Sequence, residues 1–379
     1  MTNFYRETWA EVDVDALEHN FHQFKRHHPK LALIAVVKAN AYGHGDVFVG
    51  KIFEQLGADY LAVSSLDEAL HLRNHGLSVP IMVLAPVHID HVHVAAQEKI
   101  TVIAYDETWA NQLGELSLAQ PLTVHIELET GMNRIGVRDL PKTLDALHQN
   151  EKVVVEGLYT HIHSGDSDKA SVLRQIATFE AMLGGVDGAQ FKFVHIANTA
   201  TSLQFEIPFV NMQRVGLGLY GVNPDEAFIE TSLKLLPVFS LFSKLTQVSH
   251  LFKGETVSYG GTFVAQSEQI VGTVSIGYAD GWCRLNQGRF VKVNGELCPI
   301  IGRVCMDQLM IALPHDGFVA GDVVTLIGEE LTVSLVAKET QTIAYEVLTL
   351  MSDRVPRVYK KEGRVVACVR ARHGLRGFP

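Results

Sequence analysis

The chain has few cysteines, no long apolar run and no excess of positive charge. Its four cysteines among 379 residues include no CxxC pair, which is typical of reduced thiols rather than of a disulfide framework. The start, MTNFYRETWAEVD, lacks the apolar core of a signal peptide, and no apolar run approaches membrane-spanning length. The formal net charge of −10 argues against nucleic acid or an anionic membrane as a main partner, because both attract basic surfaces. We therefore expect a cytoplasmic protein that binds neither.

Apolar segments alternate with amphipathic ones through the first 235 residues. Stretches of helical period, such as 47–56 and 66–73, separate runs rich in β-branched residues, which indicates a parallel sheet covered on both faces. The apolar runs occupy 31–37, 60–64, 80–84, 100–104, 122–128, 153–161, 191–197 and 209–215. Eight such units in roughly 200 residues predict a (β/α)8 barrel, with its active site at the carboxyl ends of the strands. An open doubly wound sheet is the alternative.

A different pattern begins near residue 236. Short strand-like segments, separated by turn signals such as Asn294–Gly295 and Gly321–Asp322, replace the helical stretches. These segments lie at 239–248, 255–264, 270–276, 290–293, 310–313 and 323–327. We predict a barrel over 11–235, a mostly β C-terminal domain over 236–379, and an N-terminal segment, 1–10, that pairs with the β domain.

Lys38 ends the first predicted strand in the segment AVVKANAYGHG, residues 35–45. Burial at a strand end lowers the pKa of a lysine and favours the neutral amine that forms an imine. Tyr42, in the loop that follows, can donate its hydroxyl to a phosphate. The alternatives are a surface lysine and a half-buried aromatic ring, but a position at a barrel mouth favours a functional Lys38.

Arg214 ends the last predicted strand, where NMQRVGLGLYG, residues 211–221, continues into a glycine loop. The N–H groups of Gly216 and Leu217 can approach a phosphate there, because glycine has no Cβ in the way. The loop also spells GxGxxG, but no βαβ unit and no ribose-binding acid follow it, which argues against a dinucleotide site.

Closure of the barrel would make its first and last strands neighbours. Lys38 and the loop after Arg214 would then share one rim with the loop that holds Asn198 and Thr199. Phosphate sites in this fold favour the loops after the seventh and eighth strands. In this sequence these loops contain Asn198–Thr199 and Gly216–Gly221. This is the arrangement needed by a phosphate-bearing cofactor held as a lysine Schiff base.

The segment YTHIHSGDSD, residues 159–168, offers the main competing interpretation. His161 and His163 form a His-x-His pair at a predicted strand end, followed by Asp166 and Asp168. Such a set can hold a metal ion, and metal-dependent hydrolases use barrels of this kind. The alternative is one histidine in the site and polar residues in a loop.

Nine motifs occur in a fixed order between residues 35 and 359. They are AVVKANAYGHG, ETGMNRIGV, GLYTHIHSGD, HIANTA, NMQRVGLGLYG, ETVSYGGTF, VSIGYADG, GRVCMDQ and RVPRVY. Together they resemble the alanine racemases, the pyridoxal-phosphate enzymes of bacterial wall synthesis, over most of the chain. The resemblance implies pyridoxal 5′-phosphate as cofactor, interconversion of L- and D-alanine for peptidoglycan, and a homodimer with shared active sites.

The resemblance also implies roles for individual residues. Lys38 would hold the cofactor aldimine and act as base toward the D-enantiomer, and Tyr259 of the second subunit would act toward the L-enantiomer. Racemisation needs two such bases, since a proton leaves one face of the α-carbon and arrives at the other. Arg214 would face the pyridine nitrogen with support from His161, while Arg134 would face the cofactor phenolate oxygen and the substrate carboxylate.

The remaining motif residues would bind the phosphate or shape the entrance. The phosphate would contact Tyr42, Asn198, Thr199, Gly216 and Leu217. The β domain would contribute Tyr278, Cys305, Met306 and Asp307 to the substrate entrance of the other subunit.

The chain departs from the family pattern at three positions. Glu127 stands where the family commonly has a lysine, often carbamylated, so its carboxylate can supply the same negative charge to the Arg134 guanidinium. A solvent-exposed glutamate without a partner is the alternative. Thr199 replaces a more usual serine and keeps the hydroxyl. Asp353 stands where some members have a tyrosine near the phosphate, and we expect this anion to point elsewhere.

Competing functions differ in the residues they need. A small pyridoxal-phosphate-binding regulatory protein does not need residues 236–379. A decarboxylase on the related scaffold needs an acidic partner for the pyridine nitrogen, where this chain has Arg214. A metal-dependent hydrolase would use His161 and His163. A serine or broader small-amino-acid racemase is the nearest alternative, since serine is the closest rival substrate.

Overall fold

The computed structural model describes residues 5–370 and 374–376, which form two compact units. One, which we term the β unit, contains the chain up to Leu17, the stretch Tyr42–Gly45 and the chain from Leu236 onward. The other, the barrel unit, contains Glu18–Ala41 and Asp46–Leu235. Residues 1–4 of the predicted N-terminal segment lie outside the described residues.

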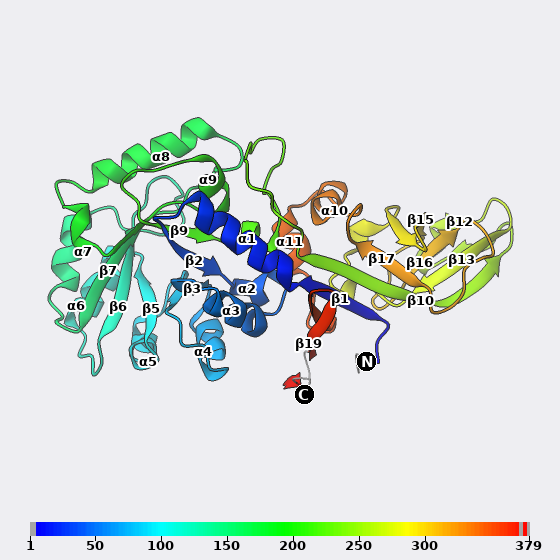
Figure 1. Ribbon diagram of the computed structural model, residues 1–379, viewed down its shortest axis with the longest axis horizontal. Coiled ribbons are helices and arrows are strands. Elements are labelled where there is room, and N and C mark those ends of the chain that lie inside the picture. The colour runs from blue at the N-terminus through cyan, green and yellow to red at the C-terminus, as the bar shows by residue number, and fades with distance from the viewer. Residues whose placement is uncertain (1–4, 371–373, 377–379) are drawn as a thin grey trace. The chain divides into compact units, whose positions relative to one another are not determined.

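Eight parallel strands close into a barrel in chain order from β2 to β9 (Figure 1). The strands are β2 (Ala32–Val36), β3 (Tyr60–Val63), β4 (Ile81–Val83), β5 (Ile100–Ala104), β6 (Leu122–Glu127), β7 (Val153–Tyr159), β8 (Phe193–His195) and β9 (Met212–Val215). Closure joins β2 to β9, with Ile34 beside Arg214. The predicted (β/α)8 barrel is confirmed, and the open doubly wound sheet is wrong.

The helices of the barrel unit lie outside its strands, as Figure 1 shows. They are α1 (Val14–His27), which begins in the β unit, α3 (Asp46–Gln55), α4 (Leu66–Asn74), α5 (Val92–Gln97), α6 (Glu107–Glu115), α7 (Leu140–Leu147), α8 (Lys169–Met182) and α9 (Thr199–Gln204). Acidic or hydroxyl side chains cap several of them, as Ser65 caps α4 and Asp168 caps α8. These oxygens accept first-turn N–H groups that the helix itself leaves unpaired. Among the described residues, no helix is long and apolar enough to cross a membrane.

A ten-stranded sheet dominates the β unit, in the order β13-β16-β15-β14-β17-β10-β1-β18-β19-β20. Its strands are β1 (Thr8–Asp13), β10 (Phe239–Leu251), β13 (Gln269–Val274), β14 (Phe290–Val293), β15 (Glu296–Ile301), β16 (Leu309–Leu313), β17 (Val323–Ile327), β18 (Arg357–Lys361), β19 (Arg364–Arg370) and β20 (Gly374–Arg376). Two helices follow β17, α10 (Val333–Glu339) and α11 (Ala344–Thr349). Strand β1 is an interior strand, antiparallel to β10 and parallel to β18.

The predicted strand at 255–264 is wrong. Two short strands, β11 (Thr256–Val257) and β12 (Phe263–Val264), pair instead across a turn at Tyr259–Gly261. Gly260 and Gly261 have φ angles of 74° and 54°, a conformation that glycine adopts without strain. The two glycines therefore reverse the chain where the apolar alternation suggested one continuous strand.

Candidate active site

A cavity of about 300 Å³ lies at the carboxyl ends of the barrel strands. Its polar wall is formed by Lys38, Ser64, Glu127, Arg134, Tyr159, His161 and Arg214, and its apolar wall by Leu84, Ala85, Pro86 and Ile135. Lys38 follows β2, Glu127 ends β6 and Arg214 lies in β9. Closure of the barrel thus brings together five of the residues that the sequence analysis selected.

Lys38 begins α2 (Lys38–Tyr42), which turns in the left-handed sense. Four consecutive residues, Ala39 to Tyr42, have φ angles of 51°, 54°, 51° and 52°. Such a conformation costs a non-glycine residue roughly 1–2 kcal/mol, so it persists only where surrounding contacts hold it. Here the Ala39 N–H donates to Glu68 at 2.7 Å, and Asn40 Oδ1 accepts from the Asp46 N–H at 3.0 Å.

The environment of Lys38 favours its neutral amine. Burial lowers the pKa of Lys38, and the cations of Arg134 and Arg214 lower it further, while Glu68 acts in the opposite direction. A neutral amine has the lone pair that attack on a carbonyl carbon requires. The cavity therefore holds a potential nucleophile beside two guanidinium groups.

Arg214 is buried, and its two terminal nitrogens are held by the barrel. Nη1 donates to His195 Nδ1 at 2.7 Å, and Nη2 donates to the Thr160 carbonyl at 2.8 Å and to His161 Nδ1 at 3.3 Å. The guanidinium lies over the ring of Tyr159, 4.9 Å from its centre. Among the described residues, no hydrogen bond engages Nε, so this N–H remains available to a ligand.

His161 is the histidine of the His-x-His pair that enters the cavity. Burial, and then the cations of Arg214, Arg134 and Lys38, lower the pKa of His161 to about 3, so it is neutral at physiological pH. His163 is exposed and instead bonds two hydroxyls, those of Ser164 at 2.6 Å and Ser171 at 3.2 Å. The described residues contain no cluster of three histidine, cysteine or acidic side chains that could hold a metal.

Glu127 is buried, so the solvent-exposed alternative is wrong. Its Oε2 accepts the hydroxyl hydrogen of Tyr159 at 2.5 Å, because the register of β6 and β7 places these two residues side by side. Burial raises the pKa of Glu127, although this hydrogen bond and the cations of Arg214 and Arg134 oppose the rise. Within the described part of the chain, no hydrogen bond or ion pair links Glu127 to Arg134. The anion acts on that arginine at a distance.

The loops after β8 and β9 are joined through Thr199. Its Oγ1 accepts the N–H groups of Gly216 at 3.1 Å and Gly218 at 3.3 Å. A Cβ at Gly218 would come within 2.5 Å of the Phe24 ring, which explains the glycine there. Asn198 caps α9 by accepting the Thr201 N–H at 3.0 Å. These contacts hold the backbone N–H groups of the glycine loop at the rim.

Tyr42 and Asp353 belong to the β unit. The Tyr42 ring packs against Tyr345, with 5.9 Å between ring centres, and burial raises its pKa. Asp353 is exposed. The nearby Arg357 is buried and donates to the carbonyls of Gly43 at 2.8 Å and Met351 at 2.7 Å.

A second cavity, of about 540 Å³, lies in the β unit. Its wall contains Tyr259, Tyr278, Ala279, Gly281, Cys283, Arg284, Arg303, Val304, Leu350 and Ser352. The side chain of Tyr259 is 71% exposed, and those of Tyr278 and Met306 are also exposed. Backbone hydrogen bonds from Tyr278 and Ala279 to the carbonyls of Cys305 and Met306, both 3.0 Å, join the two predicted entrance segments.

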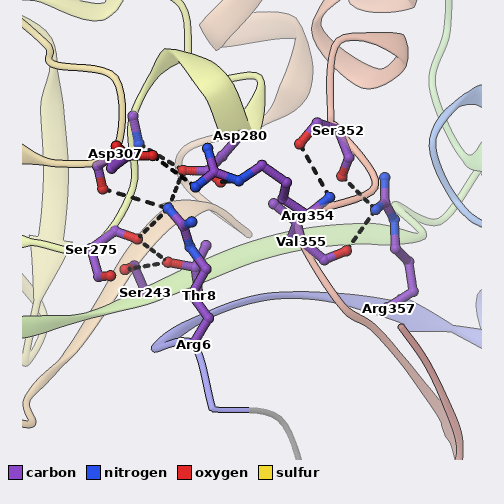
Figure 2. Close-up of polar contacts among 11 residues, drawn as sticks. Arg6, Thr8, Ser243, Ser275, Asp280, Asp307, Ser352, Arg354, Val355 and Arg357 are labelled. Atoms are coloured by element: carbon purple, nitrogen blue, oxygen red, sulfur yellow. Dashed lines mark hydrogen bonds and ion pairs between the residues drawn. The ribbon is translucent and has the colours of Figure 1, made fainter. Parts of the chain in front are cut away.

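A buried carboxylate anchors these entrance segments (Figure 2). Asp280 has a fully buried side chain, which accepts hydrogen bonds from Arg6 and from the Gly277 N–H, the latter at 3.0 Å. Arg354 lies 3.8 Å from the same carboxylate and donates to Asp307 at 2.7 Å. The N-terminal segment thus contacts the turn that carries Tyr278.

Sequence reasoning missed Tyr159, His195 and Asp280. The first two lie in the motifs GLYTHIHSGD and HIANTA, at the carboxyl ends of β7 and β8. Their position two or three residues before a selected residue, His161 or Asn198, was the available signal. Asp280 lies in the motif VSIGYADG two residues after Tyr278, but its partner Arg6 is 274 residues away in the chain.

The fold and the cavity define a two-domain barrel enzyme with an amine of lowered pKa at the barrel mouth. The family model "Alanine racemase, N-terminal domain" matches residues 12–224, and "Alanine racemase, C-terminal domain" matches residues 238–359. The chain therefore belongs to the alanine racemase family.

Individual relatives agree with this placement. An alanine racemase of Halalkalibacterium halodurans is 40% identical, with 97% of this chain and 98% of the relative covered. A crystal structure of alanine racemase from Bacillus anthracis with bound L-Ala-P is 39% identical with a TM-score of 0.92, covering 97% and 99% of the two chains. A histidine racemase from Leuconostoc mesenteroides is 27% identical with a TM-score of 0.85, covering 94% and 99%.

Proposed function

We propose that this protein interconverts L- and D-alanine with pyridoxal 5′-phosphate attached to Lys38, as a homodimer with shared active sites. The observation that carries the proposal is the cavity at the barrel mouth, where Lys38 of lowered pKa faces the guanidinium of Arg214. Family membership supplies the reaction class and the cofactor.

The residues present fit this cofactor. Lys38 offers a neutral amine to its aldehyde, and Arg214 offers the free Nε–H to the pyridine nitrogen. The N–H groups of Gly216 and Gly218 already donate to the Thr199 hydroxyl, so the glycine loop offers the backbone N–H of Leu217 to the phosphate. When bound, pyridoxal phosphate acts as an electron sink that makes the α-hydrogen of an attached amino acid acidic.

The protein groups then determine the outcome. Arg214 keeps its own proton, so a pyridine nitrogen that accepts from it stays largely unprotonated and withdraws electrons less strongly. Lys38 Nζ takes or returns the α-proton on one face, and the Tyr259 oxygen does so on the other. Arg134, at the exposed side of the cavity, holds the substrate carboxylate.

The homodimer is part of the proposal because Tyr259 belongs to the β unit and its side chain is 71% exposed. We infer that the β-unit cavity faces the barrel mouth of a second copy, with Tyr278, Cys305, Met306 and Asp307 beside the substrate entrance. Tyr42 would complete the phosphate site.

Absorption spectroscopy and peptide mapping test the proposal. Purified protein should show the absorption band of a pyridoxal-phosphate imine, which borohydride should bleach. Peptide mapping should then place the pyridoxyl group on Lys38, and a label on any other lysine would refute the site. Lys38→Ala should lose the covalent cofactor and nearly all turnover.

Assays with alanine, serine and histidine test the substrate, since a histidine racemase shares this fold. We expect alanine to be preferred. Complementation of a D-alanine-requiring bacterium would test a role in supplying D-alanine for peptidoglycan.

A further inference from the structure

A chain of hydrogen-bonded polar side chains crosses the inside of the barrel from Arg214 to Glu156. His195 Nδ1 lies 2.7 Å from Arg214 Nη1, and His195 Nε2 lies 2.8 Å from His125 Nδ1. His125 Nε2 lies 3.4 Å from Glu156 Oε2. Both histidines are fully buried. Barrels of this fold usually fill their interior with layers of branched apolar side chains, so a polar chain there needs an explanation.

The two charged ends together set the direction of every bond in this hydrogen-bond chain, since a guanidinium only donates and a carboxylate only accepts. A guanidinium only donates, so His195 Nδ1 must accept and His195 Nε2 must carry the ring hydrogen. His195 Nε2 then donates to His125 Nδ1, which leaves the hydrogen of His125 on Nε2, pointing at Glu156. Burial lowers the pKa of both histidines, so each ring is neutral and has one tautomer. The chain ends on the one group that can only accept, an ionised carboxylate.

Two local features of the fold place Glu156 at this end. The pairing of β6 with β7 matches Val124 to Val155 and then His125 to Gly157, so Glu156 is the extra residue of a β-bulge. Bulges redirect a side chain from the regular alternation of a strand. Gly157 provides space, because a Cβ there would come within 2.4 Å of the His125 ring.

Glu156 keeps its negative charge in this position. Burial alone raises the pKa of its carboxyl, but hydrogen bonds from His125, Lys192 and Tyr60 outweigh burial and lower the pKa to about 2. Lys192 Nζ donates to Glu156 Oε1 at 2.8 Å, and the Lys192 side chain is exposed. This ion pair therefore lies at the protein surface. The carboxylate contacts two buried side chains, His125 and Tyr60, and only His125 continues the chain toward Arg214.

We propose that Glu156 is a positioning residue for Arg214 and acts on it through His125 and His195. The carboxylate stabilises in both rings the tautomer that Arg214 requires, and the Nδ1 lone pair of His195 then holds Arg214 Nη1. With Nη2 held by the Thr160 carbonyl, the guanidinium has one orientation and presents Nε to the cofactor ring. The presentation of Arg214 Nε to a cofactor ring rests on the proposed function. The direction of the hydrogen bonds between Arg214 and Glu156 does not.

NMR of the protein without cofactor tests the hydrogen-bond chain independently of the proposed reaction. Histidine labelled with ¹⁵N reports each ring tautomer by NMR, and His125→Asn and His195→Asn assign the two signals. In the wild type we expect both rings as the neutral Nε2–H tautomer. In Glu156→Met, which removes the acceptor, His125 should become a mixture of tautomers. In Glu156→Gln, which keeps the shape, the His125 ring proton should move upfield.

Glu151→Gln is the matched control, since this exposed glutamate lies in the turn just before β7. It should leave both histidine signals unchanged. Unchanged histidine signals in both Glu156 variants would overturn the proposal. Glu156→Gln keeps the test available even where Glu156→Met does not fold.

The loaded enzyme tests the effect on Arg214. Loss of a charge-assisted hydrogen bond at the end of the chain should lower kcat by about tenfold in Glu156→Gln and change KM by less than about twofold. The cofactor absorption band should shift, since the partner of its ring nitrogen is less well held. A lower melting temperature with unchanged kcat and spectrum would show that the chain only fills the barrel, and would overturn the proposal. If borohydride fixes no cofactor on Lys38, the proposed function is wrong. The NMR measurement of the ring tautomers still tests the hydrogen-bond chain from Arg214 to Glu156 in that case.

Discussion

The hydroxyl of Tyr159 donates to the carboxylate of Glu127 at 2.5 Å, from the adjacent position on the neighbouring strand. The ring of the same tyrosine stacks on His195 at 4.8 Å, and the Arg214 guanidinium lies over its face. Glu127 is therefore the buried anion of a cluster that includes a cation, although it does not touch Arg134. We propose that its negative charge takes the place of the carbamylated lysine common in the family.

We predict that Glu127→Gln raises KM and lowers kcat by about tenfold while leaving the cofactor spectrum intact. The amide keeps the contact with Tyr159 but removes the negative charge that attracts the guanidinium groups of Arg134 and Arg214. The hydrogen bond from Tyr159 also changes from a charge-assisted bond to a neutral one. Steady-state kinetics in both directions measure the effect.

Tyr159→Phe is the control for Glu127→Gln, since it removes the contact and keeps the charge. Wild-type kinetics in Glu127→Gln would contradict the idea. So would activation of the native enzyme by bicarbonate, because a glutamate needs no carbon dioxide to become an anion.

Shared active sites predict that two inactive variants complement each other. Lys38→Ala and Tyr259→Phe each remove one proton-transfer group, and a mixed dimer assembles one site that carries neither change. Mixing should restore up to about one quarter of wild-type activity, as random exchange leaves half of the dimers mixed, each with one of two sites intact. Absence of recovery after proven subunit exchange would refute the shared site.

The buried histidines predict a loss of stability in acid. His161, whose pKa is lowered to about 3, takes up a proton near its ordinary value of 6.5 once the protein unfolds. Between these values the unfolded state binds more protons than the folded state. The contribution of His161 to the stability of the folded protein is therefore complete above pH 6.5 and declines as the pH falls toward 3. Each such histidine contributes about 1.4 kcal/mol per pH unit to the slope.

Chemical denaturation at several pH values between 7 and 4 measures this slope. His161→Gln should give a shallower dependence of the unfolding free energy on pH than the wild type, by about one proton. Equal slopes would contradict the assignment of a buried neutral imidazole.

Asp280 predicts a stability effect in the β unit. Asp280→Asn leaves Arg6 and Arg354 beside a neutral side chain, and we expect a loss of about 2–3 kcal/mol, since the carboxylate is fully buried. Asp307→Asn, at the exposed end of the same cluster, should cost less than about 1 kcal/mol. Urea unfolding compares them, and equal effects would contradict the view that burial makes Asp280 the anchor.

The apolar pattern was sufficient to predict the eight strands, the barrel and the common rim of Lys38 and Arg214. It could not predict the pair Glu127–Tyr159, because contacts across strands depend on a register that the sequence does not display. The bulge at Glu156 also leaves no mark in the pattern, since one extra residue does not change the apolar character of β7.

Long-range ion pairs were beyond prediction for another reason. Arg6 and Asp280 lie 274 residues apart, and nothing near either residue in the sequence indicates the other. The strand expected at 255–264 failed because the conformation of Gly260 and Gly261 prevailed over the apolar alternation.

The position of β1 has a consequence for the order in which the protein can form during synthesis. This strand leaves the ribosome first, yet its neighbours β10 and β18 begin at residues 239 and 357, after the whole barrel has been made. Domains generally fold as units while the chain grows, so the barrel can close while β1 still waits for partners. A fragment that starts at residue 236 would lack β1 and leave β10 and β18 with unpaired edges, a known route to aggregation. The barrel is in effect an insertion within the β unit, and the last strands to be made complete a sheet that the first residues began.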